Sequence, residues 1–224
     1  MDLPSFETKK DFIARKLREK ILAGEYAPGH RLKTRQLAEE FGTSEIPVRE
    51  AINQLASTGL VTIIPHVGAM ASPISSHDLE EIFQIRTALE SLATKLAAPR
   101  LSSADFDELE RLNHALKDAV DAEAEPDTLN RLNRAFHMRI YQVSENHRLI
   151  HMIEDLWNHA GRYPAPLTGR NDATYQSVRE HQEILAALKA GDATRAAELT
   201  IAHKDRSMIR ILEQVRRIER GDQP

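Results

Sequence analysis

The chain has 224 residues, of which 41% are hydrophobic and 29% are charged, and it contains no cysteine. This composition is ordinary for a globular protein and excludes disulfide bonds, thiolate metal sites and cysteine nucleophiles. No stretch approaches the roughly 18 consecutive apolar residues of a membrane span, and the opening MDLPSFETKK lacks the pattern of a signal peptide. We therefore expect a cytoplasmic protein without a membrane partner.

The net charge of −4 is divided unevenly along the chain. Residues 1–74 carry ten Lys and Arg against nine Asp and Glu, whereas residues 75–224 carry twenty against twenty-five. A near-neutral N-terminal region can still bind nucleic acid if its cations gather on one face. Composition alone therefore does not decide whether the protein binds DNA.

Three short helices are predicted in the N-terminal region. The first covers residues 8–23, where isoleucine and leucine recur every fourth residue. Thr34 can cap a second helix, RQLAEEF, which ends at Gly42, and Ser44 can cap a third that runs to about residue 58. Two short helices joined by a turn that contains glycine form a helix-turn-helix.

Two short apolar stretches follow the third helix. LVTII and AMAS flank the turn PHVG, a pattern that predicts a small β-hairpin. A hairpin placed after a helix-turn-helix forms the wing of a winged helix-turn-helix. Residues 1–74 are therefore predicted to be a DNA-binding domain.

The helix that begins at Ser44 is the one expected to enter the major groove. Arg49 on this helix can bond a phosphate or a guanine, and Asn53 lies one turn further along the same face. The predicted DNA contacts are Arg35, Ser44, Glu45, Arg49, Asn53, His66 and Gly68. The alternative is a helical hairpin used for protein contacts, in which Arg49 is merely solvated.

Residues 75–224 show helical patterns throughout and no strand pattern. The predicted helices cover residues 76–98, 103–121, 127–143, 147–162, 173–190 and 193–219. The predicted fold class is therefore mainly α, with the N-terminal winged helix-turn-helix followed by an antiparallel bundle of about six helices.

Four polar residues fall within the apolar stripes of three of these helices. They are Asn133, His137, His181 and His203. Buried imidazoles need hydrogen-bond partners or a metal, because unpaired burial is costly. Each one alone is more often a hydrogen-bonded core residue than a metal ligand. Whether the four residues meet is not decided by the sequence, because it depends on distances between separate helices. His147 and His151 have better chelate spacing, but they share a polar face, so we expect them to be solvated.

The run PGHRLKTRQLAEEFGTSEIPVREAINQLASTGLVTIIPHVGAMAS resembles the winged helix of GntR-family regulators. The family pattern is similar to PG-x-x-L, LAE-x-x-G-x-S, PVREA-x-x-L-x-x-x-GLV and P-x-x-G. The resemblance implies binding to double-stranded DNA, and we expect a homodimer on an inverted-repeat operator because one recognition helix reads too few base pairs. Glu45 departs from the family, which usually has an operator-contacting arginine there. A glutamate can accept from a cytosine amino group, so we expect an altered base preference.

The C-terminal region is similar to the FCD domain of the FadR subfamily. The matching segments are EIFQIRTALESLATKLAA, NRAFHMRIYQVSENHRLI and EHQEILAALKAGD. The resemblance implies that Asn133, His137, His181 and His203 are metal ligands, with zinc favoured and nickel or another transition metal as alternatives. Most relatives have aspartate in place of Asn133. The resemblance also implies a small organic acid or sugar acid as effector, and Arg86 is the predicted contact to its carboxylate.

The sequence therefore predicts a ligand-responsive transcription regulator, in the first place a repressor, and not an enzyme. One alternative is a metal-dependent hydrolase or oxygenase that uses the three-histidine site. Against it, the implied ligand set has no carboxylate, and the sequence singles out no Asp or Glu as a general base. A purely structural helical adaptor would leave the winged-helix pattern unexplained.

Overall fold

The computed structural model describes residues 8–220, and the chain forms two compact units. Among the described residues, the first unit holds residues 8–77, 158–164 and 213–220, and the second holds 78–157 and 165–212. The predicted division into residues 1–74 and 75–224 is a single cut in the sequence, and it stays a prediction. Within the described range, no helix combines the length and apolar content that crossing a membrane requires.

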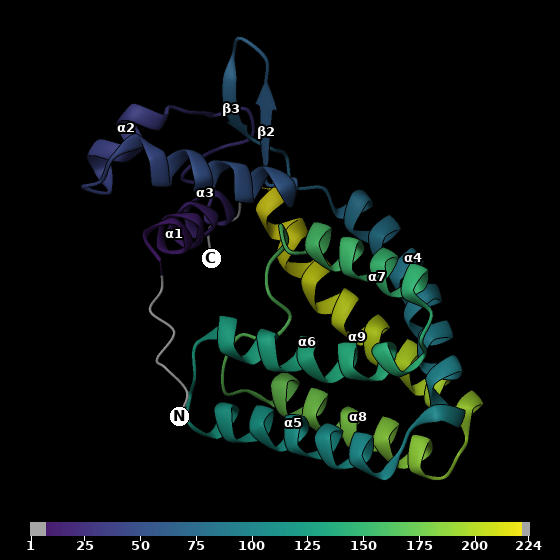
Figure 1. Ribbon diagram of the computed structural model, residues 1–224. Helices are drawn as coiled ribbons and strands as arrows, with labels where there is room; N and C mark the ends of the chain where they lie inside the picture. Colours follow the sequence, from purple (N-terminus) through teal and green to yellow (C-terminus); the bar gives the residue numbers. More distant parts are fainter. Residues whose placement is uncertain (1–7, 221–224) are drawn as a thin grey trace. The chain divides into compact units, whose positions relative to one another are not determined.

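The first unit is a winged helix-turn-helix (Figure 1). Its elements are α1 (Lys9–Leu22), β1 (Arg31–Leu32), α2 (Thr34–Glu40), α3 (Glu45–Ser57), β2 (Val61–Ile64) and β3 (Gly68–Ala71). The strands form an antiparallel sheet in the order β1-β3-β2. The predicted hairpin is therefore present, with Val61 opposite Ala71 and Ile64 opposite Gly68. Strand β1 was not predicted, because two residues are too few to show an alternating pattern.

The core of this unit comes from the apolar faces of its helices. Helix α3 buries the face expected from its sequence, which consists of Val48, Ala51, Ile52 and Leu55. These side chains pack with Leu17 of α1 and Leu37 of α2. Burial of this face leaves the opposite side of α3 exposed, which is the side that carries Arg49 and Asn53.

Two predicted helix caps differ in detail from the structure. Thr34 is the first residue of α2, and Lys33 occupies the cap position without a side-chain capping bond. The helix begins one residue early because strand β1 ends at Leu32, which leaves only Lys33 to turn the chain. Ser44 does occupy the cap position of α3, but its side chain makes no capping hydrogen bond. Helix α3 therefore begins without a side-chain cap.

The second unit is built from helices that agree with the predicted ranges within a residue or two. They are α4 (Ser76–Ala97), α5 (Ser103–Asp121), α6 (Pro126–Val143), α7 (His147–Ala160), α8 (Asp172–Lys189) and α9 (Ala193–Arg220), with a short 3-10 turn at Ala98–Arg100. Residues 76–77 of α4, 158–160 of α7 and 213–220 of α9 are counted with the first unit. Helix α5 packs against both α6 and α8 (Figure 1). Its start is fixed by a capping box between Ser102 and Asp105. Pro126 begins α6, where its missing N–H costs nothing.

The core of the helical unit contains fully buried aromatic and aliphatic side chains. Phe136 and Tyr141 of α6 pack there with Leu109 of α5 and Ile184 of α8. The same interior also holds buried polar and charged side chains. Such groups are costly to bury unless they are paired, so their partners define the candidate site.

Candidate functional site

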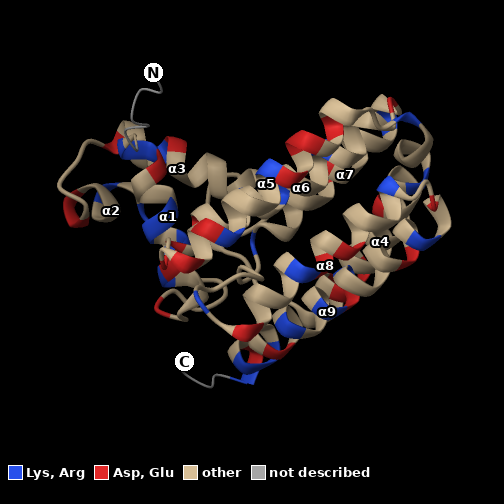
Figure 2. Ribbon diagram, turned by 90° about the horizontal axis from the view of Figure 1, so that it is seen from below, with Lys and Arg blue, Asp and Glu red and all other residues tan. Residues whose placement is uncertain are grey.

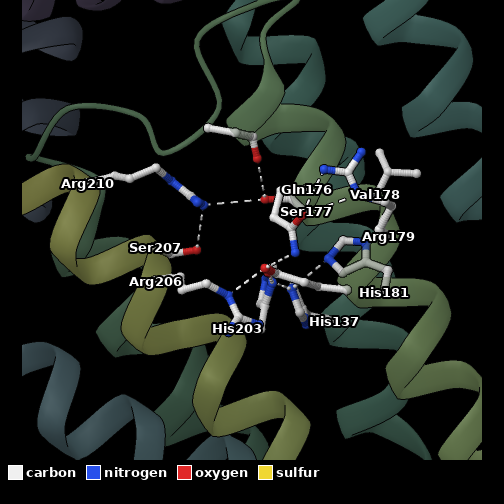
Figure 3. Close-up of polar contacts among 12 residues, drawn as sticks. His137, Gln176, Ser177, Val178, Arg179, His181, His203, Arg206, Ser207 and Arg210 are labelled. Atoms are coloured by element: carbon white, nitrogen blue, oxygen red, sulfur yellow. Dashed lines mark hydrogen bonds and ion pairs between the residues drawn. The ribbon is translucent and has the colours of Figure 1, made fainter.

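Three imidazole rings meet inside the helical unit. His137 comes from α6, His181 from α8 and His203 from α9, and none of the three is more than 2% exposed. The Nε2 atom of His137 lies 3.1 Å from Nε2 of His203 and 3.2 Å from Nε2 of His181. Figure 3 shows the three residues gathered at one point. The structure therefore brings together the histidines that the sequence singled out on three separate helices.

Hydrogen bonds at the far side of two rings fix their protonation. The side-chain amide of Asn113 donates to the carbonyl of Val178 (3.1 Å), so its oxygen faces Nδ1 of His181 (3.1 Å) as an acceptor. Nδ1 of His203 donates to Glu180 over 2.6 Å. A proton on Nδ1 leaves the Nε2 lone pair of each neutral ring directed into the cluster.

The three Nε2 atoms cannot satisfy one another as neutral rings. A proton on Nε2 of His137 could be donated to His181 or to His203, but not to both. Burial first, and then the charges of Lys204 and the neighbouring His203, hold the pKa of His137 and His181 well below the ordinary value of 6.5. Neutral imidazole is the form that ligates a metal. A divalent cation would satisfy all three lone pairs at once.

Asn133 supplies a fourth candidate ligand one turn before His137 on α6. Its side chain is 6% exposed, and its Oδ1 atom is buried without a hydrogen-bond partner among residues 8–220. An unpaired buried carbonyl oxygen carries a free-energy cost that a cation would remove. The four residues therefore fit a divalent metal ion in donor type and in number.

Glu180 braces the cluster from the side of α8 and α9. Its carboxylate is 2% exposed and accepts from Gln176 (3.0 Å) and Arg206 (2.5 Å) as well as from His203. Burial alone would raise the pKa of Glu180, but these donors outweigh it and hold the pKa below the usual 4.5. The ionised carboxylate thus fixes the orientation of His203, as partners of metal-bound histidines commonly do.

A second buried cluster of charges surrounds Glu90 on α4. This fully buried carboxylate accepts from Nε of Arg86 (2.8 Å) and from the hydroxyl of Tyr141 (2.6 Å), and it pairs with Nζ of Lys204 at 2.6 Å. Burial raises the pKa of a carboxyl, but Lys204 and Arg86 outweigh burial here and lower the pKa of Glu90 to about 2. Burial in turn lowers the pKa of Lys204 to about 8. With these pKa values, Glu90 is ionised at neutral pH and Lys204 is mostly protonated.

Trp157 on α7 joins the two clusters. The centroid of its indole lies 4.3 Å from Cζ of Arg86, 4.5 Å from Nζ of Lys204 and 6.2 Å from the ring of His137. Arg86, the predicted effector contact, is therefore buried beside the histidines and already engaged by Glu90. Cations over an indole face are stabilised by its quadrupole.

The predicted DNA contacts of α3 lie on its exposed face. Ser44, Arg49 and Asn53 are exposed, and Glu45 is half-buried. A terminal guanidinium nitrogen of Arg49 donates to Glu45 over 2.8 Å, and the side chain of Arg49 is still 69% exposed. The two charges that sequence analysis treated separately thus form one i,i+4 pair.

The remaining predicted DNA contacts lie on α2 and on the wing. Arg35 is 83% exposed and pairs with Glu39 one turn on. His66 lies exposed in the turn of the wing with a φ of 61°, and Gly68 begins β3. Basic and acidic residues are interspersed along the helices in Figure 2.

Sequence reasoning missed several residues of the buried site. Glu180 directly precedes His181, and Lys204 directly follows His203. Glu90 lies one helical turn after Arg86, so each of the three is close to a residue that the sequence had already singled out. Asn113 and Trp157 gave no such signal. His147 and His151, in contrast, are exposed as expected, with the side chain of His151 79% accessible.

Taken together, the fold and the buried cluster define a winged-helix DNA-binding protein with an attached helical domain that has a polar centre. Residues 9–70 match the family of bacterial regulatory proteins named gntR, and residues 81–206 match the FCD domain. The chain belongs to the GntR family of transcriptional regulators, in the group that carries an FCD domain, as the resemblance predicted.

Curated relatives and solved structures agree with this assignment. The chain is 34% identical to the HTH-type transcriptional regulator McbR of Escherichia coli K12 over 180 residues, 79% of this chain and 80% of the relative. It is 30% identical to the HTH-type transcriptional repressor GlaR of the same strain, over 84% of this chain and 88% of the relative. The solved structure of E. coli McbR/YncC superposes with a TM-score of 0.67 at 29% identity, covering 93% and 99% of the two chains. These relatives confirm a DNA-binding regulator and not an enzyme.

Proposed function

We propose that the protein is a homodimeric repressor whose binding to an inverted-repeat operator is controlled by a small carboxylate bound beside a divalent metal ion. The observation that carries this proposal is the convergence of three Nε2 atoms whose lone pairs have too few protons to share. The relative named as a repressor supports the direction of regulation.

His137, His181, His203 and Asn133 would hold the ion. Three neutral imidazoles and an amide oxygen suit zinc first, with nickel or another borderline cation as alternatives. When bound, such an ion offers a Lewis-acidic position to a carboxylate oxygen. Arg86 supports the same ligand class, because Glu90 engages its Nε atom and so fixes the plane of the guanidinium. We assign its terminal nitrogens to the effector carboxylate.

On the DNA side, α3 would enter the major groove with Arg49 and Asn53 toward the bases and Glu45 setting the preference. Arg35 and Ser44 would contact the backbone near α2 and α3, and the wing would do so near His66 and Gly68. An inverted repeat of this kind is read by a two-fold protein.

A stripe on α4 supports the homodimer. Ile85, Leu92 and Leu96 share one helical face and are 50%, 45% and 37% exposed. A second copy that covered this stripe would bury apolar area otherwise left in water. Sedimentation should show a dimer that Leu92→Glu weakens, whereas Gln84→Glu, off the stripe, should leave it intact. A parent protein that sediments as a monomer while bound to DNA would refute the dimer.

The function is tested with labelled DNA from upstream of the protein's own gene. Fluorescence anisotropy would measure binding by the zinc-loaded protein alone and with a panel of small carboxylates. We expect specific binding that at least one acid weakens, and that the acid fails to weaken in the zinc-free protein. Binding that no carboxylate alters, with or without zinc, would contradict ligand control.

A further inference from the structure

A third cation lies near the indole of Trp157, besides the two that would face the first carboxylate of an effector. Besides Arg86 and Lys204, Cζ of Arg134 on α6 lies 5.6 Å from the indole centroid. Burial lowers the pKa of Arg134, and the charge of Arg86 lowers it further while Glu154 raises it. Three cations therefore surround one indole.

Two carboxylates act on these three cations. Glu90 is shared between Arg86 and Lys204, and Glu154 offsets Arg134. Three positive charges against two negative ones leave one positive charge, which the first carboxylate of the effector would balance before any metal is counted. A divalent ion on the histidines, with Glu180 already matched by Arg206, would increase that positive charge. A ligand with a single carboxylate would leave most of it in place.

The indole itself has an unused donor. Nε1 of Trp157 is buried and has no hydrogen-bond partner among the described residues. A buried N–H without an acceptor is costly, so such a group often marks where a ligand or water accepts. This donor belongs to the same side chain that contacts all three cations.

We infer that Trp157 and Arg134 form a second anion-recognition group, and that the effector is therefore a short dicarboxylate. The inference rests on the proposed function for the metal ion and for the first carboxylate at Arg86. The second carboxylate accepts from the indole N–H and faces the guanidinium of Arg134. The chain between the two carboxylates is short, because the indole lies only 6.2 Å from the ring of His137.

The experiment compares acids of equal length that differ in one charge. Succinate is paired with butyrate and glutarate with pentanoate, each titrated into zinc-loaded protein by calorimetry. Trp157 is the only tryptophan in the chain, so its fluorescence reports independently on binding at this site. We expect at least one dicarboxylate to bind roughly tenfold or more tightly than its partner acid, because it gains charge-assisted hydrogen bonds.

Two variants assign that preference to residues. Arg134→Gln should bind the dicarboxylate about as weakly as the monocarboxylate, whereas Arg131→Gln, an exposed arginine on the same helix, should behave like the parent. Trp157→Phe keeps a ring beside the cations but removes the donor, so dicarboxylate affinity should fall roughly tenfold while monocarboxylate affinity is unchanged. Zinc content and circular dichroism show whether each variant is folded. If Trp157→Phe is not folded, the result for Arg134→Gln alone decides whether the preference belongs to these residues.

The possible failures are distinguishable. Equal affinity for both acids of each pair in a protein that binds zinc overturns the inference and leaves the proposed function standing. A dicarboxylate preference that survives both Arg134→Gln and Trp157→Phe overturns the assignment to these residues. A parent protein that binds neither zinc nor any of the four acids overturns the proposed function together with the inference.

Discussion

The charged residues of α3 and those inside the helical unit are paired in opposite environments. Arg49 and Glu45 form a pair whose side chains are 69% and 44% exposed, where water screens the attraction and either partner can leave at little cost. Lys204 and Glu90 form a pair whose side chains are 4% and 0% exposed. Removing one member of this buried pair leaves the other charge unpaired in a medium of low dielectric constant.

This difference separates the role proposed for α3 in DNA binding from the role proposed for the helical unit in ligand binding. Arg49 can exchange Glu45 for DNA because an exposed pair contributes only about 0 to 1 kcal/mol. Lys204 and Glu90, in contrast, are buried, so neither can leave its partner unless a ligand takes the partner's place. Changes on α3 should therefore alter DNA binding and leave stability unchanged, whereas changes at Glu90 should act on stability first.

The largest effect is expected for Glu90→Gln. The substitution removes a buried carboxylate that pairs with both Arg86 and Lys204, so the free energy of unfolding should fall by about 3 to 5 kcal/mol. Urea denaturation followed by circular dichroism measures the change. Glu108→Gln breaks a surface pair with Arg111 and should cost no more than about 1 kcal/mol. Equal costs for the two variants would contradict the contrast between buried and exposed pairs.

The contribution of Glu90 should also depend on pH. Its pKa is about 2 in the folded chain against an ordinary 4.5, so its stabilisation is complete above about pH 4.5 and is lost as the pH falls toward 2. The gap in unfolding free energy between the parent and Glu90→Gln should narrow by about 3 kcal/mol over that range. Denaturation curves at several pH values measure the gap. A gap that stays constant down to pH 2 would show that Glu90 is not held ionised by its neighbours.

On the exposed side, Arg49→Ala should weaken operator binding by about 1 to 3 kcal/mol if Arg49 meets a base. The unfolding transition should not move, because the lost pair with Glu45 lies in water. Anisotropy with specific and scrambled DNA measures the first effect, and thermal denaturation measures the second. Unchanged affinity in the folded variant would remove Arg49 from the reading face.

The smallest change in specific affinity is expected for Glu45→Arg, with its main effect on sequence preference. The substitution releases Arg49 from its partner and adds a second cation, so general DNA affinity and its salt dependence should rise while the preferred bases shift toward guanine. Selection from a random DNA pool, run beside the parent, reads the preference. Identical selected sequences for the two proteins would show that Glu45 does not face the bases.

The fold was predictable because its signals are local. Glycines, prolines and apolar spacing placed each helix within a residue or two, and two short apolar stretches around the turn PHVG placed the two strands of the wing. Strand β1 escaped because Arg31–Leu32 is stabilised by pairing with β3, a partner almost forty residues away, and not by a pattern of its own. Whether the hydroxyl of Ser44 makes a capping hydrogen bond likewise depends on side-chain geometry, which composition does not encode.

The site was predictable only in part. The inward histidines stand out because a polar residue within an apolar stripe breaks a local period, and the resemblance implied their common role. Their partners Asn113 and Glu180 are selected by distances across helices, which a one-dimensional pattern does not contain. Trp157 is the clearest case, since its cations come from α4, α6 and α9 and meet only in the folded chain.

Metal content of the purified protein, measured by inductively coupled plasma mass spectrometry, tests the histidine cluster most directly. The parent should carry about one divalent ion per chain, and His137→Ala, His181→Ala and His203→Ala should each lose it, because three imidazoles hold the ion together. His151→Ala, which removes an exposed histidine, should keep it. Full occupancy in all three buried-histidine variants would contradict the site.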